Sequence, residues 1–269
     1  MLTVDFERLA LRPGMTVLDA GCGQGRHSLE LLRRGCHALA LDLNLAELKY
    51  TRFLLDSLLG GEAPPSPQGG ETSTRAGATD SAGATEAPEA PDNPDASEAQ
   101  PPPPYLVLRG NAQTLPFRAA SFDRVLCSEV LEHVDDPRRA AAELARVLKP
   151  GGMLAASVPT PATEWLYRFS SDDYFNTPGG HVRIFSMGGL RKLLSSQGLE
   201  VIDLHFEHAF HSLYWWVRCV FGLHAENHPA IRHCKKILTH VMFSPALERA
   251  ERWSNWVFPK SMVLYARRV

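Results

Sequence analysis

The sequence predicts an α/β fold in which a mostly parallel β-sheet carries helices on both faces. Two observations support this prediction. Short, almost entirely apolar runs alternate along the chain with runs of helical periodicity, and this alternation is typical of parallel sheets that are buried on both faces. The 269 residues, 44% of them hydrophobic, also suffice for one large domain or two small ones.

Seven apolar segments, most of them ending near a turn, are expected to form strands. They are residues 15–19, 37–42, 105–110, 122–128, 152–159, 199–206 and 261–268. Between them, apolar residues recur at helical spacing, and Gly or Pro stands at the ends of several of these runs. The helices expected on this basis are residues 27–35, 45–61, 137–152 and 186–198.

Residues 60–104 interrupt the pattern. They hold 10 of the 20 prolines and, alanine apart, no hydrophobic residue, so they cannot bury enough apolar surface to offset the entropy of ordering. We expect a disordered, acidic, Pro-rich insert, interpreted as a tolerated loop expansion. Its eight acidic residues and one basic residue give a net charge of -7, which leaves the other 224 residues at +5 although the whole chain is at -2.

Composition also excludes several classes of protein. The near-neutral chain has no basic footprint for nucleic acid, and it contains no run of about 18 apolar residues that would cross a membrane. Its five scattered cysteines suit neither a disulfide framework nor a zinc site, and we expect free thiols. Because the N-terminus lacks the features of a signal peptide, we expect a cytoplasmic location.

The turn after the first strand carries the first binding signal. It reads VLDAGCGQGRHS: Asp19 ends the strand, and Gly21, Gly23 and Gly25 alternate before a helix. Glycines let a ligand approach the backbone, and a helix N-terminus presents unpaired N–H groups. Asp42 closes the second strand 21 positions after Gly21, where an acid accepts hydrogen bonds from a ribose diol. Together these residues predict a nucleoside pocket.

A dinucleotide site is the rival interpretation of this turn. The dinucleotide fingerprint needs a third glycine where this chain has Arg26. The charge of Asp19 would repel a pyrophosphate but would attract a cationic ligand. The sequence therefore favours a cationic nucleoside over NAD, and an NAD-dependent oxidoreductase is the less favoured alternative.

Five motifs, in this order and at these spacings, resemble the class I S-adenosylmethionine-dependent methyltransferases. The resemblance is to the type 11 group, which includes the ubiquinone and menaquinone methyltransferases, and it covers about residues 1–60, 105–210 and 261–269. The motifs are VLDAGCGQG, LDLN, GNAQTLPF, SFDRVLCSEVLEHVDDP and LKPGG. The resemblance implies a Rossmann-like seven-stranded sheet with its last strand antiparallel, and an enzyme that transfers a methyl group from S-adenosylmethionine.

The same resemblance implies which residues hold the cofactor. The glycine turn would wrap its methionine and ribose part, Asp42 would bind the ribose, an Asn-Ala pair would meet the adenine, and the end of the fourth strand would lie near the methyl group. The residues so implied are Asp19, Gly21, Gly23, Gly25, Asp42, Leu43, Asn111, Ala112, Ser128, Glu129 and Val130. Asn111 replaces the usual acid of the family but keeps an acceptor oxygen.

Methyl transfer from a sulfonium needs little acid–base machinery, because the methyl group is already activated. For a hydroxyl acceptor a base would help, and the candidates are His133 and His181. A structural hydrogen bond is the alternative for His133. His181 and Arg183 lie in the segment where this family places its acceptor pocket, so we expect both to bind substrate. We expect no metal.

Residues 211–260 extend the connection between the last two strands. They contain four of the five tryptophans and seven basic against three acidic residues, with amphipathic patterns over 231–243 and 246–257. One interpretation is a helical cap that closes a large hydrophobic acceptor pocket. The other is an interfacial surface that reaches a lipid-embedded acceptor.

The sequence thus predicts a methyltransferase domain formed by residues 1–59, 105–210 and 261–269, with the insert at 60–104 and the helical cap at 211–260. Its acceptor is expected to be a fairly large, partly apolar small molecule of the quinone, lipid or secondary-metabolite class, methylated at O or C. The alternative is a non-catalytic S-adenosylmethionine-binding protein that uses its C-terminal helices to bind a partner. The sequence favours no oligomeric state.

Overall fold

The structure is a computed structural model that describes residues 2–59, 104–171, 173–174, 180–241 and 244–269. Apart from Pro104, the predicted disordered insert lies outside these residues. The five cysteines all lie within them and are free thiols, as expected.

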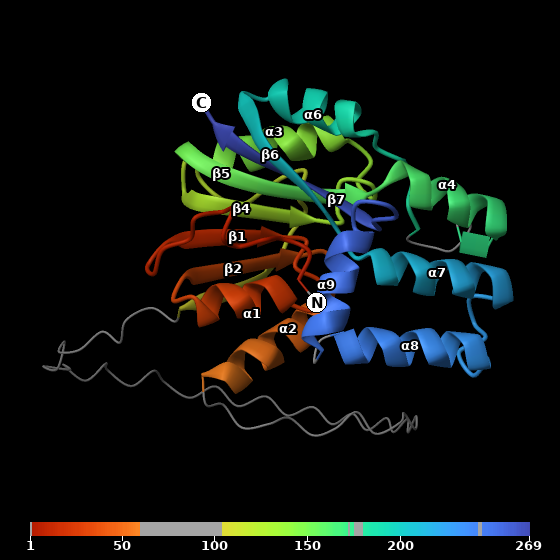
Figure 1. The fold of residues 1–269 in the computed structure, drawn as a ribbon. Helices are drawn as coiled ribbons and strands as arrows, with labels where there is room; N and C mark the ends of the chain where they lie inside the picture. The colour runs from red at the N-terminus through yellow and green to blue at the C-terminus, as the bar shows by residue number, and fades with distance from the viewer. Residues whose placement is uncertain (1, 60–103, 172, 175–179, 242–243) are drawn as a thin grey trace, which may run out of the picture.

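The fold is built on one seven-stranded sheet of order β3-β2-β1-β4-β5-β7-β6 (Figure 1). Neighbouring strands from β1 to β5 are parallel, whereas β7 is antiparallel to both β5 and β6. This arrangement confirms the predicted Rossmann-like α/β sheet with an antiparallel last strand. The strands are β1 Thr16–Ala20, β2 His37–Asp42, β3 Tyr105–Arg109, β4 Phe122–Ser128, β5 Leu148–Pro159, β6 Leu199–Glu207 and β7 Ser261–Arg268.

Eight helices accompany the sheet in the described part of the chain. They are α1 Arg26–Arg33, α2 Leu45–Leu58, α3 Pro137–Val147, α4 Pro161–Ser170, α6 Met187–Ser195, α7 Ala209–Phe221, α8 Pro229–Val241 and α9 Pro245–Ser254. The prediction that the third helix continues to residue 152 was wrong, because Leu148 already pairs with Phe122 of β4 and the chain is extended from there. Helices α4 and α7 were not predicted.

The two faces of the sheet bury separate apolar clusters. Successive side chains of a strand point to opposite faces, so Leu18 joins the cluster with Leu144 and Leu190 of α3 and α6, while Val17 joins the cluster with Leu31 of α1. All five side chains are fully buried. Because β1 pairs with both β2 and β4, this buried sheet holds the carboxyl ends of the three strands side by side.

Helices α4, α7, α8 and α9 gather beyond the carboxyl ends of the parallel strands (Figure 1). Helix α7 packs against α4, α8 and α9, and the hydroxyl of Tyr167 in α4 donates to the carbonyl of Ser212 in α7 at 3.1 Å. Helices α7 to α9 occupy the stretch predicted as a cap, although the domain boundaries at 211 and 260 stay a prediction. Among the helices described, none has the length and apolarity that crossing a membrane requires.

Candidate cofactor and acceptor site

The glycine turn between β1 and α1 requires its glycines. Gly21, Gly23 and Gly25 have φ angles of 78°, 50° and 75°, in the left-handed region that glycine adopts at low cost. A Cβ on Gly21 would lie 2.2 Å from Cγ2 of Val130, and one on Gly25 would lie 2.6 Å from Cγ2 of Thr51. The turn therefore lies directly against Val130, just past the end of β4, and against α2, whereas nothing lies within 4 Å of a Cβ placed on Gly23.

Asp19 lies under this turn and is fully buried. Its Oδ2 accepts a hydrogen bond of 2.7 Å from the Ser28 hydroxyl, whereas its Oδ1 has no partner among the described residues. Burial raises the pKa of the carboxyl group to about 6, against the hydrogen bond from Ser28 and the charge of Arg26, which lower it. Since buried polar atoms are normally hydrogen-bonded, Oδ1 is a ready acceptor for a cationic ligand.

Asp42 ends β2 at the same edge of the sheet. Its Oδ2 accepts from the Gly23 N–H at 2.9 Å and its Oδ1 from the Asn44 N–H at 2.8 Å. A carboxylate has about four lone-pair sites, so two remain for a ribose diol. The next side chain, Leu43, is 55% exposed and free to pack against a base.

The Asn-Ala pair follows β3. The Gly110 N–H donates to the carbonyl of Asp42 at 3.0 Å, which places the pair beside the ribose-binding residue. Asn111 Oδ1 accepts from the Gln113 N–H at 2.9 Å, and Ala112 is buried. The Gln113 side-chain amide also donates to this oxygen at 3.4 Å, so both lone pairs of Asn111 Oδ1 are used within its own turn. The contact of Asn111 with adenine stays a prediction.

The residues at the end of β4 are predicted to lie near the methyl group of the cofactor. One of them, Glu129, forms an ion pair with Lys260 that the sequence did not predict. Glu129 Oε2 lies 3.1 Å from Nζ of Lys260, just before β7. Burial alone would raise the pKa of Glu129, but the charge of Lys260 and the hydrogen bond from its ammonium group, together with weaker contributions from His181 and Ser261, lower the pKa below its usual value. The Ser128 and Ser157 hydroxyls are hydrogen-bonded at 2.9 Å, and Ser157 also donates to Glu129.

The structure brings His133 and His181 together, with ring centroids 4.9 Å apart. His181 Nδ1 lies 2.7 Å from Oε2 of the buried Glu164, and His133 Nδ1 lies 3.2 Å from the carbonyl of Gly180. Glu132, beside His133, is 1% exposed, and neither of its carboxyl oxygens has a hydrogen-bond partner in the described chain, although Oε1 lies 4.0 Å from Nε2 of His133. Burial, then the charge of Glu129, raises the pKa of Glu132 well above its usual range, and burial lowers the pKa of His133.

Sequence reasoning missed both acids of this cluster. Glu132 lies in the stretch SEVLEH, three positions after Glu129 and directly before His133. This spacing of two acids and a histidine could have indicated Glu132 as a site residue. Glu164 belongs to α4, which was not predicted.

Arg183 contacts backbone in this structure. Its guanidinium donates to the carbonyls of Leu131, Val134 and Asp135. These bonds hold the turn that carries Glu132 and His133, so they give Arg183 a positioning role. Its predicted contact with substrate stays a prediction.

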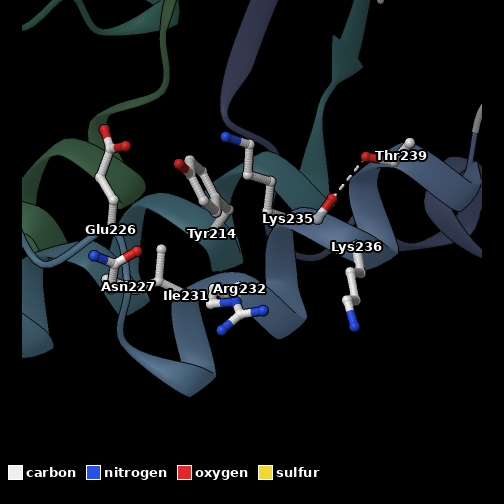
Figure 2. A pocket seen from close by; sticks show the side chains of 8 residues that line it. All are labelled: Tyr214, Glu226, Asn227, Ile231, Arg232, Lys235, Lys236 and Thr239. Carbon is white, nitrogen blue, oxygen red and sulfur yellow. Dashed lines mark hydrogen bonds between the residues drawn. The ribbon is translucent and has the colours of Figure 1, made fainter.

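A surface hollow of about 420 Å³ lies away from the glycine turn, between α7, α8 and their connection (Figure 2). Its cations are Arg232, Lys235 and Lys236, and Thr239 donates to the Lys235 carbonyl at 3.0 Å. The hollow adds a basic surface to the helices beyond the sheet.

The fold and this edge of the sheet define a class I S-adenosylmethionine-dependent methyltransferase, with S-adenosylmethionine as its cofactor. A model of the methyltransferase domain family matches residues 3–204, and the chain belongs to that family. This membership confirms the family that the five motifs indicated and leaves the oxidoreductase alternative without support.

Two curated relatives and one solved structure illustrate the similarity. The chain is 34% identical over 155 residues to a ubiquinone biosynthesis O-methyltransferase of Hahella chejuensis, an alignment that covers 57% of this chain and 47% of the relative. It is 28% identical over 204 residues to the O-methyltransferase rstn1 of Aspergillus nomiae, covering 73% and 69%. A crystal structure of an S-adenosylmethionine-dependent methyltransferase from Mesorhizobium loti superposes with a TM-score of 0.52 at 17% identity, covering 95% and 92%. The chain thus spans about half the length of the Hahella relative.

Proposed function

We propose that this protein transfers the methyl group of S-adenosylmethionine to a hydroxyl oxygen of a fairly large, partly apolar small molecule. The observation that carries the proposal is that the glycine turn of the cofactor site and the pair formed by His133 and His181 lie next to each other. Val130 borders Gly21 of the cofactor turn, and three residues later His133 meets His181. The relatives named as O-methyltransferases support oxygen as the acceptor atom, with carbon as the second choice.

The chemistry requires alignment and removal of one proton. The acceptor oxygen attacks the sulfonium methyl carbon, the C–S bond breaks, and S-adenosylhomocysteine leaves as a neutral thioether. Burial keeps the pKa of His133 low, so this imidazole is neutral near pH 7 and able to take up the hydroxyl proton. The histidine pair is therefore the general-base candidate of the proposal.

Incubation with methyl-labelled S-adenosylmethionine and phenolic acceptors of increasing apolar tail length should give labelled ethers. Replacing His133 by Gln should lower kcat by about 100-fold, because a general base contributes that much, and should leave cofactor affinity unchanged. The matched control is His240→Gln on the exposed side of α8, which should retain full activity. Tight cofactor binding without transfer to any acceptor or cell-extract component would instead favour the non-catalytic alternative.

We further propose that the protein is cytoplasmic and contacts the surface of a lipid membrane through residues 211–260. Trp253 and Trp256 at the end of α9 are each 80% exposed and Val257 is 85% exposed, while Lys235 and Lys236 of α8 add positive charge. Exposed tryptophans together with basic residues are typical of interfacial helices. A lipid-embedded acceptor would then reach the site from the membrane.

The full-length protein should sediment with vesicles that contain phosphatidylserine and should remain largely in solution with phosphatidylcholine vesicles. The double variant Trp253→Ser/Trp256→Ser should reduce sedimentation at least tenfold, since it removes the exposed apolar area. Trp215→Phe is the control, because Trp215 packs against Tyr174 and Tyr214. Equal sedimentation of the double variant and the wild type would refute this contact surface.

A further inference from the structure

His208, His211 and Glu251 form a group of potential metal ligands between α7 and α9. One ligand atom from each lies within 4.8 Å of the others. The two histidines stand three positions apart at the start of α7, where residues so spaced are neighbours on one face of a helix, and their ring centroids are 5.2 Å apart. Glu251 lies on α9, which packs against α7 (Figure 1). The group therefore connects two helices that α8 separates along the chain.

Hydrogen bonds hold the junction between these two helices in place. Directly after α9, Oδ1 of Asn255 accepts from the Ala209 N–H at 2.8 Å, and Nδ2 of Asn255 donates to Oε2 of Glu207 at 3.0 Å. Glu251 also accepts a hydrogen bond from the Phe210 N–H. The backbone that carries the three side chains is therefore positioned without a metal, as a preorganised site requires.

Three buried atoms of the group lack a hydrogen-bond partner within the described part of the chain. They are Nδ1 of His208, Nδ1 of His211 and Oε1 of Glu251. The side chains of His208 and Glu251 are buried, at 6% and 4% exposure. Buried polar atoms are normally hydrogen-bonded, and buried charges are paired or bind metals. Three unpartnered atoms that converge in one place therefore point to a bound cation.

The other ring nitrogen of His208 has the partner that a metal-bound histidine needs. Nε2 of His208 lies 3.1 Å from the Thr3 hydroxyl, to which the Arg26 guanidinium donates at 2.9 Å. The hydroxyl oxygen has two lone pairs, so one is left to accept from an Nε2–H, and the ring then carries its own lone pair on Nδ1. An acceptor of this kind is the usual second partner of a histidine that binds a metal.

Both imidazoles are neutral at pH 7. Burial, before the nearby positive charges, lowers the pKa of His211 to about 4 and that of His208 well below its usual range. Metal ions bind the neutral imidazole, because the lone pair must be free of a proton. No proton therefore has to leave either ring when a metal binds.

The charges around the group are mixed in sign. Lys260 and Arg26 act on both histidines, but Lys260 is paired with Glu129 at 3.1 Å. Close by, burial and then the charge of Glu251 raise the pKa of Glu207 to about 7. A cation bound to Glu251 offsets this repulsion between the two carboxylates.

We propose that His208, His211 and Glu251 bind one Zn²⁺ ion, and that this ion fastens α7 to α9. Imidazole nitrogen and carboxylate oxygen are donors that suit Zn²⁺, and a water or the second oxygen of Glu251 completes four positions. Tetrahedral ligands about 2.1 Å from zinc lie about 3.4 Å apart, so the three ligand atoms close by at most about 1.4 Å. The ion is structural, and the site does not depend on the proposed methyl transfer.

The test is zinc binding by the full-length protein after chelator treatment, measured by equilibrium dialysis with elemental analysis. His211→Gln and Glu251→Gln should each weaken binding at least 100-fold, whereas His240→Gln on the exposed side of α8 should change it less than twofold. Co²⁺ serves as a second probe, because its visible absorption reports the ligands around the ion. All measurements are repeated in the His133→Gln background, since His133 belongs to another group of potential ligands in the described chain, and the ion that depends on Glu251 should remain.

Thermal unfolding in the same His133→Gln background gives a readout that is independent of activity. Zinc at a hundredfold excess over its Kd should raise the unfolding temperature by about 5 to 10 °C, and it should not do so in Glu251→Gln. The metal-free Glu251→Gln protein should unfold at no lower temperature than its metal-free parent, because Gln removes a buried carboxyl group that has an unpartnered oxygen. Absence of bound zinc in this background, or equal zinc affinity with and without Glu251→Gln and His211→Gln, would overturn the site whether or not methyl transfer is observed.

Discussion

Replacing Asp42 by Ala is expected to weaken S-adenosylmethionine binding by about 100-fold. Two hydrogen bonds from the ribose diol to a charged acceptor are worth about 3 kcal/mol together, and about 1.4 kcal/mol corresponds to tenfold in affinity. The variant also loses the acceptors for the N–H groups of Gly23 and Asn44. The turn and the ribose site are therefore weakened together.

Isothermal titration calorimetry with S-adenosylmethionine measures this loss. Asn44→Ala is the matched control: its side chain caps α2 by accepting from the Ala46 N–H at 2.9 Å. Loss of this cap should lower stability by about 1 kcal/mol and leave the affinity nearly unchanged. An affinity of Asp42→Ala within threefold of the wild type would show that Asp42 does not hold the ribose.

The cofactor half of the site was predictable because each of its parts is local. Asp19 and the three glycines occupy a single turn, and Asp42 ends the next strand along the chain. Parallel strands bring their carboxyl ends to one edge of a sheet, so neighbouring strand ends predict neighbouring side chains. The sheet order, with β1 between β2 and β4, fulfils that condition.

The acceptor half was predictable only in part, because its contacts are remote in sequence. Glu129 and Lys260 are 131 positions apart, and no local pattern pairs them. Glu164 lies on α4, in a segment interpreted only as the acceptor region; its helix begins with Pro161 at the first position, a signal that was available. The two histidines were named individually, but only the tertiary fold shows that their rings lie 4.9 Å apart and beside the buried Glu132 and Glu164.

Asp19→Asn is expected to make the protein more stable and the cofactor bind more weakly. Burial raises the folded-state pKa of Asp19 to about 6 from 3.8, so the folded protein favours the protonated acid. Below about pH 4 the carboxyl group is protonated in both states and does not lower the free energy of unfolding. Its destabilising effect grows as the pH rises from 4 to 6 and is complete above pH 6. That penalty is about 3 kcal/mol at most, and an Asn side chain, which does not ionise, avoids it.

Thermal unfolding and calorimetry at pH 4 to 7.5 measure both effects. The variant should unfold about 5 to 10 °C above the wild type at pH 7 and at nearly the same temperature at pH 4. Its affinity for S-adenosylmethionine should be at least tenfold lower at pH 7, because the unpartnered Oδ1 no longer offers a negative charge to the cofactor. Wild-type affinity should also fall between pH 7 and 5, as Asp19 takes up its proton, and that of the variant should not. If Asn lowers stability at pH 7, or if both proteins bind the cofactor equally, Asp19 is a structural residue and the cationic end of the cofactor lies elsewhere.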